Sequence, residues 1–308
     1  MSEDSLHINS KSKTVVHGPL LTWLACAICV LIFIGISNEK VRSWDTLSKW
    51  GYFSPNAIWD GKYFALLSSV FVHLQLWHLA FNVYWLWVLG GALERSIGLL
   101  RWLAFFVIAA IISSGIQLAI SSTTGVGASG VVYAMFGFMW VARDRYAMFA
   151  ASLPKQTIIL FVAWLILCVI TTFLKIWNIG NWAHISGLLF GVGIAAIFVL
   201  KYRVRQIIIA EAVLVALAII PLFWCPWSMI WVSNKAYDAH FSGDYQSAIS
   251  WYKRSLKLGQ DPIWVWSNLA ISYKTIGDQE NYKDALQQLR KFDVDAAKEI
   301  EEDVQDGH

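Results

Sequence analysis

Two residues that could carry out nucleophilic chemistry lie in separate apolar segments of this chain. Ser129 is followed by Gly130, and His184 is followed three residues later by Gly187. Polar groups at membrane depth are costly, so each is a candidate for function. An imidazole that takes the proton of a hydroxyl makes that oxygen able to attack a carbonyl carbon. The pair therefore predicts hydrolysis inside a lipid bilayer.

The segment that begins with Ser129 is too short to cross a bilayer from face to face. The 12 residues from Ser129 to Trp140 cover about 18 Å, against a hydrocarbon core of about 30 Å. Ser129 must then start below one surface, and residues 121–127 before it must be irregular backbone that lines a cavity. Gly127 and Gly130 leave room beside the hydroxyl for another backbone or for a scissile peptide.

The helix that carries His184 has a face of small residues. His184, Gly187 and Gly191 are spaced at i, i+3 and i+7, so two notches follow the imidazole on one side of the helix. Small residues allow helices to approach closely in lipid. If the neighbour is the Ser129 helix, the hydroxyl and the imidazole can come within roughly 3 Å. Tyr133, one turn after Ser129, could then orient the ring, and without a carboxylate the site would be a dyad.

Two further polar residues share a helix face in an earlier apolar segment. His78 and Asn82 are four residues apart, one turn along a helix. Both can donate hydrogen bonds to an oxyanion, and such donors are usually the largest single catalytic contribution. His73 lies off that face, and we interpret it as a loop residue or hydrogen-bonding anchor. We expect no metal and no cofactor to take part.

The elements that must position these residues are membrane helices. The 308-residue chain is 57% hydrophobic and 15% charged, with mean hydropathy +0.52, far above a soluble domain. Apolar runs predict seven crossings at 20–36, 73–93, 99–120, 129–142, 156–174, 182–200 and 206–232. The net charge of +3 is accounted for by cations that flank these spans, and it gives no support to nucleic-acid binding. The four cysteines all lie in apolar segments and do not indicate a disulfide framework.

The cations between the spans predict the orientation. Lys and Arg residues collect near positions 11–13, 95–101, 143–155 and 201–205, in alternate loops, which assigns those loops to the cytoplasm. Residues 1–19 lack an apolar core and are predicted to be a cytosolic tail rather than a signal peptide. We expect a multi-pass protein of a bacterial inner (plasma) membrane with its N-terminus in the cytoplasm.

Residues 234–308 have the composition of a soluble helical domain with an internal repeat. Gly243 and Asp244 recur as Gly277 and Asp278, and this period of 34 residues is that of tetratricopeptide repeats. Matching Ala248 with a later alanine, 37 residues on, suggests about three inserted residues in the second copy. Such units need stacked neighbours to bury their apolar faces. We expect this domain to bind a protein partner or the ectodomain of a substrate.

Residues 206–232 decide on which side of the membrane the soluble domain lies. The segment is long enough to cross, and a full crossing would put the domain outside the cytoplasm. Pro221 and Pro226 interrupt it, however, and Trp224, Trp227 and Trp231 are typical of an interface. We favour an extra transmembrane helix, and a re-entrant segment that leaves the domain inside remains the alternative.

The motifs taken together resemble those of the rhomboid intramembrane serine proteases. The likeness covers roughly residues 50 to 200 and consists of three motifs in order: His73-x4-His78-x3-Asn82, Gly127-x-Ser129-Gly130 and Ala183-His184-x2-Gly187-x3-Gly191. The resemblance implies Ser129 as nucleophile and His184 as general base. It also implies an oxyanion hole from His78, Asn82 and the Ser129 backbone N–H, with Tyr133 against His184 and a lateral substrate gate at Phe81 and Trp164.

The resemblance completes the expected fold and function. The fold would be all-α, with a rhomboid-like six-helix core at 20–200, a seventh helix at 206–232 and the tetratricopeptide-like domain at 234–308. The substrates would be transmembrane proteins with an unstable helix top and a small residue at the cut. One stretch departs from the family: residues 61–65, Gly-Lys-Tyr-Phe-Ala, lack the Trp-Arg pair usual before the second span, which puts the packing of the first loop in doubt.

Each of these polar residues could also have a purely structural role. Serine in a helix often bonds back to its own backbone, and a histidine or a His78–Asn82 pair can simply join helices. Two further functions are compatible with the sequence. An inactive rhomboid-like module could bind or recruit membrane proteins, and a transporter could use His78 and His184 as a proton path, although no inverted repeat is visible. The presence of both Ser129 and His184 favours the protease.

Overall fold

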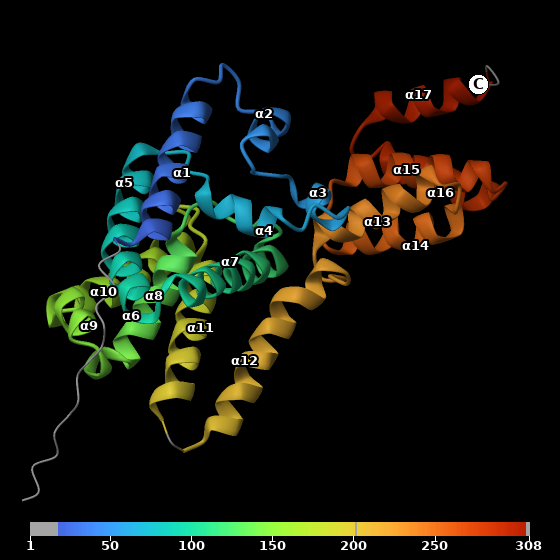
Figure 1. The fold of residues 1–308 in the computed structure, drawn as a ribbon. Coiled ribbons are helices and arrows are strands. Elements are labelled where there is room, and N and C mark those ends of the chain that lie inside the picture. Colours follow the sequence, from blue (N-terminus) through green and yellow to red (C-terminus); the bar gives the residue numbers. More distant parts are fainter. Residues whose placement is uncertain (1–17, 201, 306–308) are drawn as a thin grey trace, which may run out of the picture.

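The part of the chain that the computed structural model describes, residues 18–200 and 202–305, is built from helices without a β-strand (Figure 1). In this part six helical segments are long and apolar enough to cross a membrane. They are α1 (Leu20–Ser37), the segment Leu76–Ile97 formed by α5 (Leu76–Trp85), the π-helical turn η2 (Leu86–Gly90) and α6 (Gly91–Ile97), then α7 (Leu99–Ser121), α10 (Lys155–Phe173), α11 (Asn181–Val199), and the segment Val204–Leu222 formed by α12 (Val204–Ile219) and η4 (Ile220–Leu222). The shorter α8 (Ser129–Val141) is also apolar.

Most of the predicted spans agree with these helices to within a residue or two, but the second starts later. Residues 73–93 were expected to be one helix, whereas the helix begins at Leu76 and continues through the π-helical turn to Ile97. His73 therefore precedes the helix, and its Nδ1 lies 3.2 Å from the carbonyl oxygen of Phe71. The predicted N-terminal tail, residues 1–19, falls almost entirely outside the described residues.

The seventh predicted span, residues 206–232, is not one helix. The membrane helix ends at Leu222, and a new helix, α13 (Met229–Phe241), begins after a short linker. Proline has no backbone N–H and clashes with the preceding turn, so Pro221 and Pro226 end the first helix. The Ser228 hydroxyl then caps the second by accepting a hydrogen bond from the Trp231 N–H. Trp231 and Val232 thus belong to the soluble part and not to the membrane helix.

Short helices fill the loops. The first loop, residues 38–75, contains α2 (Trp44–Lys49), α3 (Pro55–Trp59), α4 (Ala65–Ser68) and η1 (Ser69–Phe71), while η3 (Arg143–Arg145) and α9 (Ala147–Ser152) follow α8. Ser43 and Ser54 cap α2 and α3 through their hydroxyls, the usual way to satisfy first-turn N–H groups. At the opposite end of the bundle, the Glu94 carboxylate accepts hydrogen bonds from the Leu21 and Thr22 N–H groups, which caps α1.

Helix α8 lies at the centre of the bundle, packed against α11. Its residues from Gly130 to Met139 are buried, and the glycines of both helices remove the side chains that would separate them. A Cβ on Gly137 would lie 2.7 Å from the Leu188 carbonyl oxygen, and a Cβ on Gly187 would overlap the carbonyl oxygen of Gly130. The backbones are therefore in direct contact, which is the packing that small residues allow between membrane helices.

The residues after the linker form a separate core of paired helices. α13 is followed by α14 (Tyr245–Lys257), α15 (Pro262–Thr275), α16 (Gln279–Leu289) and α17 (Val294–Gln305). Asp244 and Asp278 cap α14 and α16 in the same way, so the displacement of 34 residues holds into the second pair. The three-residue insertion suggested by the sequence is wrong, because Ala248 corresponds in register to buried Tyr282. Alanine and tyrosine at one position hid the match.

This helical domain packs against the membrane part on the face where α7 ends and α8 begins (Figure 1). A hydrophobic cluster joins residues from the first loop, α7, the linker and α13: Ile58, Trp59, Ala65, Leu66, Leu118, Leu222, Cys225, Trp231 and Val232. The Trp59 indole donates to the Pro221 carbonyl (3.1 Å), and Asn234 donates to the Asp60 carboxylate (3.2 Å). The first loop, despite its missing Trp-Arg pair, is thus held between the bundle and the helical domain.

Candidate active site

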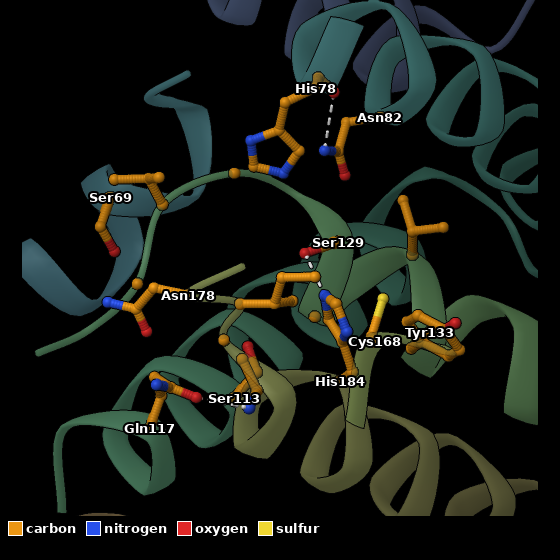
Figure 2. Close-up of a pocket in the computed structure, with 18 of the residues that line it drawn as sticks. Ser69, His78, Asn82, Ser113, Gln117, Ser129, Tyr133, Cys168, Asn178 and His184 are labelled. Carbon is orange, nitrogen blue, oxygen red and sulfur yellow. Dashed lines mark hydrogen bonds between the residues drawn. The ribbon is translucent and has the colours of Figure 1, made fainter. Parts of the chain in front are cut away.

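Ser129 and His184 are in direct contact. Ser129 is the first residue of α8 and His184 lies in the first turn of α11, and the Ser129 Oγ is 2.8 Å from the His184 Nε2 (Figure 2). His184 is only 5% exposed. The distance matches the approach expected from the sequence and is that of a hydrogen bond in which the hydroxyl can donate to the imidazole. This arrangement can transfer the serine proton to the ring.

The glycine contacts between α8 and α11 produce this geometry. The position a Cβ would take on Gly130 lies 3.2 Å from the Ala183 carbonyl oxygen and 2.7 Å from the Ser113 side chain. Gly187 contacts the Gly130 carbonyl from the other helix. Because the close backbone approach occurs within one turn of both functional side chains, it fixes the distance between them.

Tyr133 holds the imidazole in place. Its ring packs on that of His184, with centroids 4.9 Å apart and an interplanar angle of 30°, and its hydroxyl donates to the Phe161 carbonyl (3.1 Å). The other ring nitrogen of His184, Nδ1, is buried and has no hydrogen-bond partner among the described residues. The ring is therefore oriented by packing and by the serine, without a carboxylate, as the sequence predicted for a dyad.

His78 and Asn82 line the pocket from α5. Asn82 is 2% exposed and donates through Nδ2 to the His78 carbonyl (2.9 Å), which leaves its second amide hydrogen free for another acceptor. Gly127 has a positive φ of 97°, and a Cβ there would lie 2.9 Å from the His78 Nε2. Only glycine permits both this backbone conformation and this approach. Gly127 thus lets the His78 ring come down over the loop that leads to Ser129.

The start of α8 adds an electrostatic contribution. The first N–H groups of a helix have no partner within it, and they form the positive end of the helix dipole. Ser129 stands at this end. Negative charge that develops beside the Ser129 Oγ would accordingly be stabilised by backbone N–H groups as well as by side chains on α5.

A cavity of about 550 Å³ surrounds these groups. Its lining includes Ser129, His184, His78, Asn82, Tyr133 and Gly127, together with Phe81 from α5 and Trp164 from α10. The Phe81 and Trp164 rings are 5.3 Å apart at their centroids. They contact one another across α5 and α10 beside the pocket, as expected for the two predicted gate residues. The structure therefore brings all eight predicted site residues to one cavity.

Several lining residues were not singled out from the sequence. Gln117, which could have been packing or cavity lining, does both: its Oε1 accepts a hydrogen bond from the Ala183 N–H (3.1 Å), next to His184. Ser113, one turn earlier on α7, also lines the cavity, as do Cys168 and Asn178. The spacing of Ser113 and Gln117 at i and i+4 in an apolar helix was the available signal for the first pair. Asn178 lies in a loop, and no pattern marked it.

Comparison with known proteins supports one family. Residues 60–203 match the family model described as Rhomboid domain. The chain is 31% identical over 199 residues to the rhomboid protease GlpG of Salmonella newport (strain SL254), and equally to that of Salmonella typhimurium (strain LT2). The match covers 61% of this chain and 66% of those proteins, just under two thirds of their length. With the apolar helices, these findings support a rhomboid-family integral membrane protein.

Proposed function

Taking residues 60–203 as a rhomboid domain, we propose that this chain is an intramembrane serine endopeptidase. The contact of 2.8 Å between the Ser129 Oγ and the His184 Nε2 is the observation that carries the proposal. It gives a nucleophile and a general base the separation that proton transfer needs. The relatives named as rhomboid proteases support the same reaction class.

The reaction would run in two stages. The Ser129 Oγ attacks the carbonyl carbon of the scissile peptide while its proton moves to the His184 Nε2. His78, Asn82 and the Ser129 N–H stabilise the resulting oxyanion. His184 then gives the proton to the departing amine, which leaves an ester on Ser129. Water attacks this ester with His184 again as base, which releases the second product and restores the serine.

The substrates proposed are transmembrane proteins. A peptide bond within a helix is shielded by its own backbone, so a segment with an unstable helix top and a small residue at the cut would reach Ser129 most readily. Phe81 and Trp164, in contact between α5 and α10, are the side chains that a substrate entering sideways from lipid would have to part. The inner membrane of a bacterium, with the N-terminus in the cytoplasm and the pocket opening on the other side, is the proposed location.

We propose in addition that residues 234–308 are a tetratricopeptide-like module that binds a protein partner or a substrate ectodomain. The helix pairs α13–α14 and α15–α16 repeat in register, and α17 covers the second pair through buried Ala297. The module packs on the same face as the pocket. Deleting residues 245–308, which keeps α13 on the first loop, should alter substrate choice or complexes; unchanged substrates and complexes would exclude this role.

The catalytic proposal is tested by labelling with a fluorophosphonate in native membranes. Wild-type chain should be labelled, whereas Ser129→Ala should be unlabelled and should no longer cut a transmembrane reporter in vesicles. Gel filtration would establish that the variant is folded. Labelling that persists without the Ser129 hydroxyl rejects this nucleophile, and a wild-type chain that is never labelled supports the inactive, binding-only alternative.

A further inference from the structure

The carboxyl end of α7 is held by the linker between α12 and α13, far along the sequence. The last carbonyls of a helix have no donor within the helix and need partners from elsewhere. Here the Trp227 indole N–H donates to the Ala119 carbonyl (2.8 Å), and the Cys225 thiol lies 3.8 Å from the same oxygen. The Ser228 hydroxyl lies 2.8 Å from that of Ser122, the residue that ends α7.

The linker itself is firmly anchored. Ser228 is 4% exposed and also caps α13, and Arg254 on α14 donates twice to the Pro226 carbonyl (3.1 and 2.8 Å). On the other side, Trp59 of the first loop donates to the Pro221 carbonyl. Residues 221–228 are therefore fixed from both directions, and they can fix whatever they contact in turn.

The end of α7 leads to both members of the dyad. Two residues before Ala119, Gln117 accepts a hydrogen bond from the Ala183 N–H, adjacent to His184. Beyond Ser122, residues 123–127 line the pocket and run directly into α8 at Ser129. Ser122 has a left-handed conformation with φ 54°, which is uncommon for a residue with a side chain. Its contact with Ser228 stands at the point where the chain turns from α7 into the pocket loop.

We propose that Trp227 and Ser228 are positioning residues for the Ser129–His184 dyad. They hold the end of α7, and α7 sets the pocket loop before Ser129 and the first turn of α11 before His184. This inference rests on the proposed protease function and extends it: the reaction centre depends on a segment outside the rhomboid domain match, which ends at residue 203. The linker thus joins the helical domain to the chemistry.

The test measures, in the full-length chain, the rate at which a fluorophosphonate labels Ser129, and kcat and KM for a transmembrane reporter. Trp227→Phe keeps an aromatic ring and removes only the donor to Ala119. Because misplacing reacting groups by 1 Å can cost about 100-fold, we expect labelling and kcat to fall roughly tenfold or more, with KM unchanged. Trp224→Phe is the matched control. Trp224 is 58% exposed and makes no hydrogen bond to the described residues, so its variant should behave as wild type.

A second pair of variants separates positioning from folding. Ser228→Ala should lower the labelling rate, whereas Ser228→Thr, which keeps the hydroxyl, should restore it. Ser122→Asn offers a third route, since asparagine tolerates the left-handed conformation and can still bond to Ser228. Wild-type rates in both Trp227→Phe and Ser228→Ala, or equal losses in Trp224→Phe, would overturn the inference. A wild-type chain without Ser129 labelling would instead reject the protease proposal itself.

Discussion

Substituting Gly187 by alanine should separate the two helices that bring the dyad together. The new Cβ would overlap the Gly130 carbonyl oxygen and lie 2.9 Å from its carbonyl carbon, where ordinary contact begins at 3.4 Å. The carbon clearance alone demands about 0.5 Å, and the oxygen overlap demands more. Neither atom belongs to a flexible side chain, so the backbones of α8 and α11 must move apart.

The consequence for catalysis follows from the distance at the site. His184 is one turn before Gly187, and Ser129 directly precedes Gly130, so the displacement acts where the 2.8 Å contact is made. A separation on the order of 1 Å would carry the Oγ and Nε2 beyond hydrogen-bond distance and can cost about 100-fold in rate. Overpacking of a core typically costs about 1–3 kcal/mol in stability, which a multi-helix bundle can tolerate while remaining folded.

The assay compares fluorophosphonate labelling and reporter cleavage in detergent or vesicles, together with thermal unfolding. Gly193→Ala provides a control on the same helix. Its Cβ would meet the end of the Glu211 side chain on α12 rather than the α8 backbone, so labelling should stay near the wild-type rate. A Gly187→Ala chain that is labelled as fast as wild type would show that this backbone contact does not set the dyad, and so would an equal loss in Gly193→Ala.

Three further predictions address the ring support, the oxyanion and the helical domain. Tyr133→Phe keeps the ring against His184 and loses one hydrogen bond, so kcat should fall less than about tenfold, whereas Tyr133→Leu should cost roughly 10- to 100-fold; equal rates for the two would contradict ring support. Asn82→Ala should lower kcat about 100- to 1,000-fold with KM little changed, and a change confined to KM would exclude an oxyanion role. Hydrogen bonds from the side chain and backbone of Ser247 lower the pKa of Asp244, so protection of α14 amides from hydrogen exchange should be full above about pH 4 and be lost as the pH falls through the lowered value, because the unfolded pKa is near 3.9. Asp244→Asn keeps the cap and should flatten that dependence, and an unchanged profile would show that another group is responsible.

The membrane helices were predictable because hydropathy reports them directly. The span expected at 156–174 is observed as Lys155–Phe173, and that at 182–200 as Asn181–Val199. The error at 206–232 arose because the apolar composition continues through the linker, so that hydropathy could not distinguish a membrane helix from the buried start of a soluble one. Pro221 and Pro226 were visible, but only the packing of the linker against α7 decides where the helix stops.

The site was predictable to the extent that its residues are polar in apolar surroundings. Ser129, His184, His78 and Asn82 each stand out in that way, and the glycine spacing identified α8 and α11 as neighbours. The short helices of the first loop, and the residues of the linker that reach α7, carry no such mark. In the sequence Trp227 is typical of an interface tryptophan, and its bond to the Ala119 carbonyl depends on a fold in which residues 108 positions apart meet.

The absence of a carboxylate beside His184 among the described residues is consistent with the depth of the site. An aspartate at the centre of a membrane helix costs about 2.5–3.5 kcal/mol on insertion scales, and the His184 Nδ1 makes no hydrogen bond to the described part of the chain. The Tyr133 ring and the α8–α11 contact orient the imidazole without adding a charge. Orientation by packing makes the reaction sensitive to helix separation. Substitutions that shift α7, α8 or α11 by fractions of an ångström should therefore reduce the rate well before they unfold the bundle.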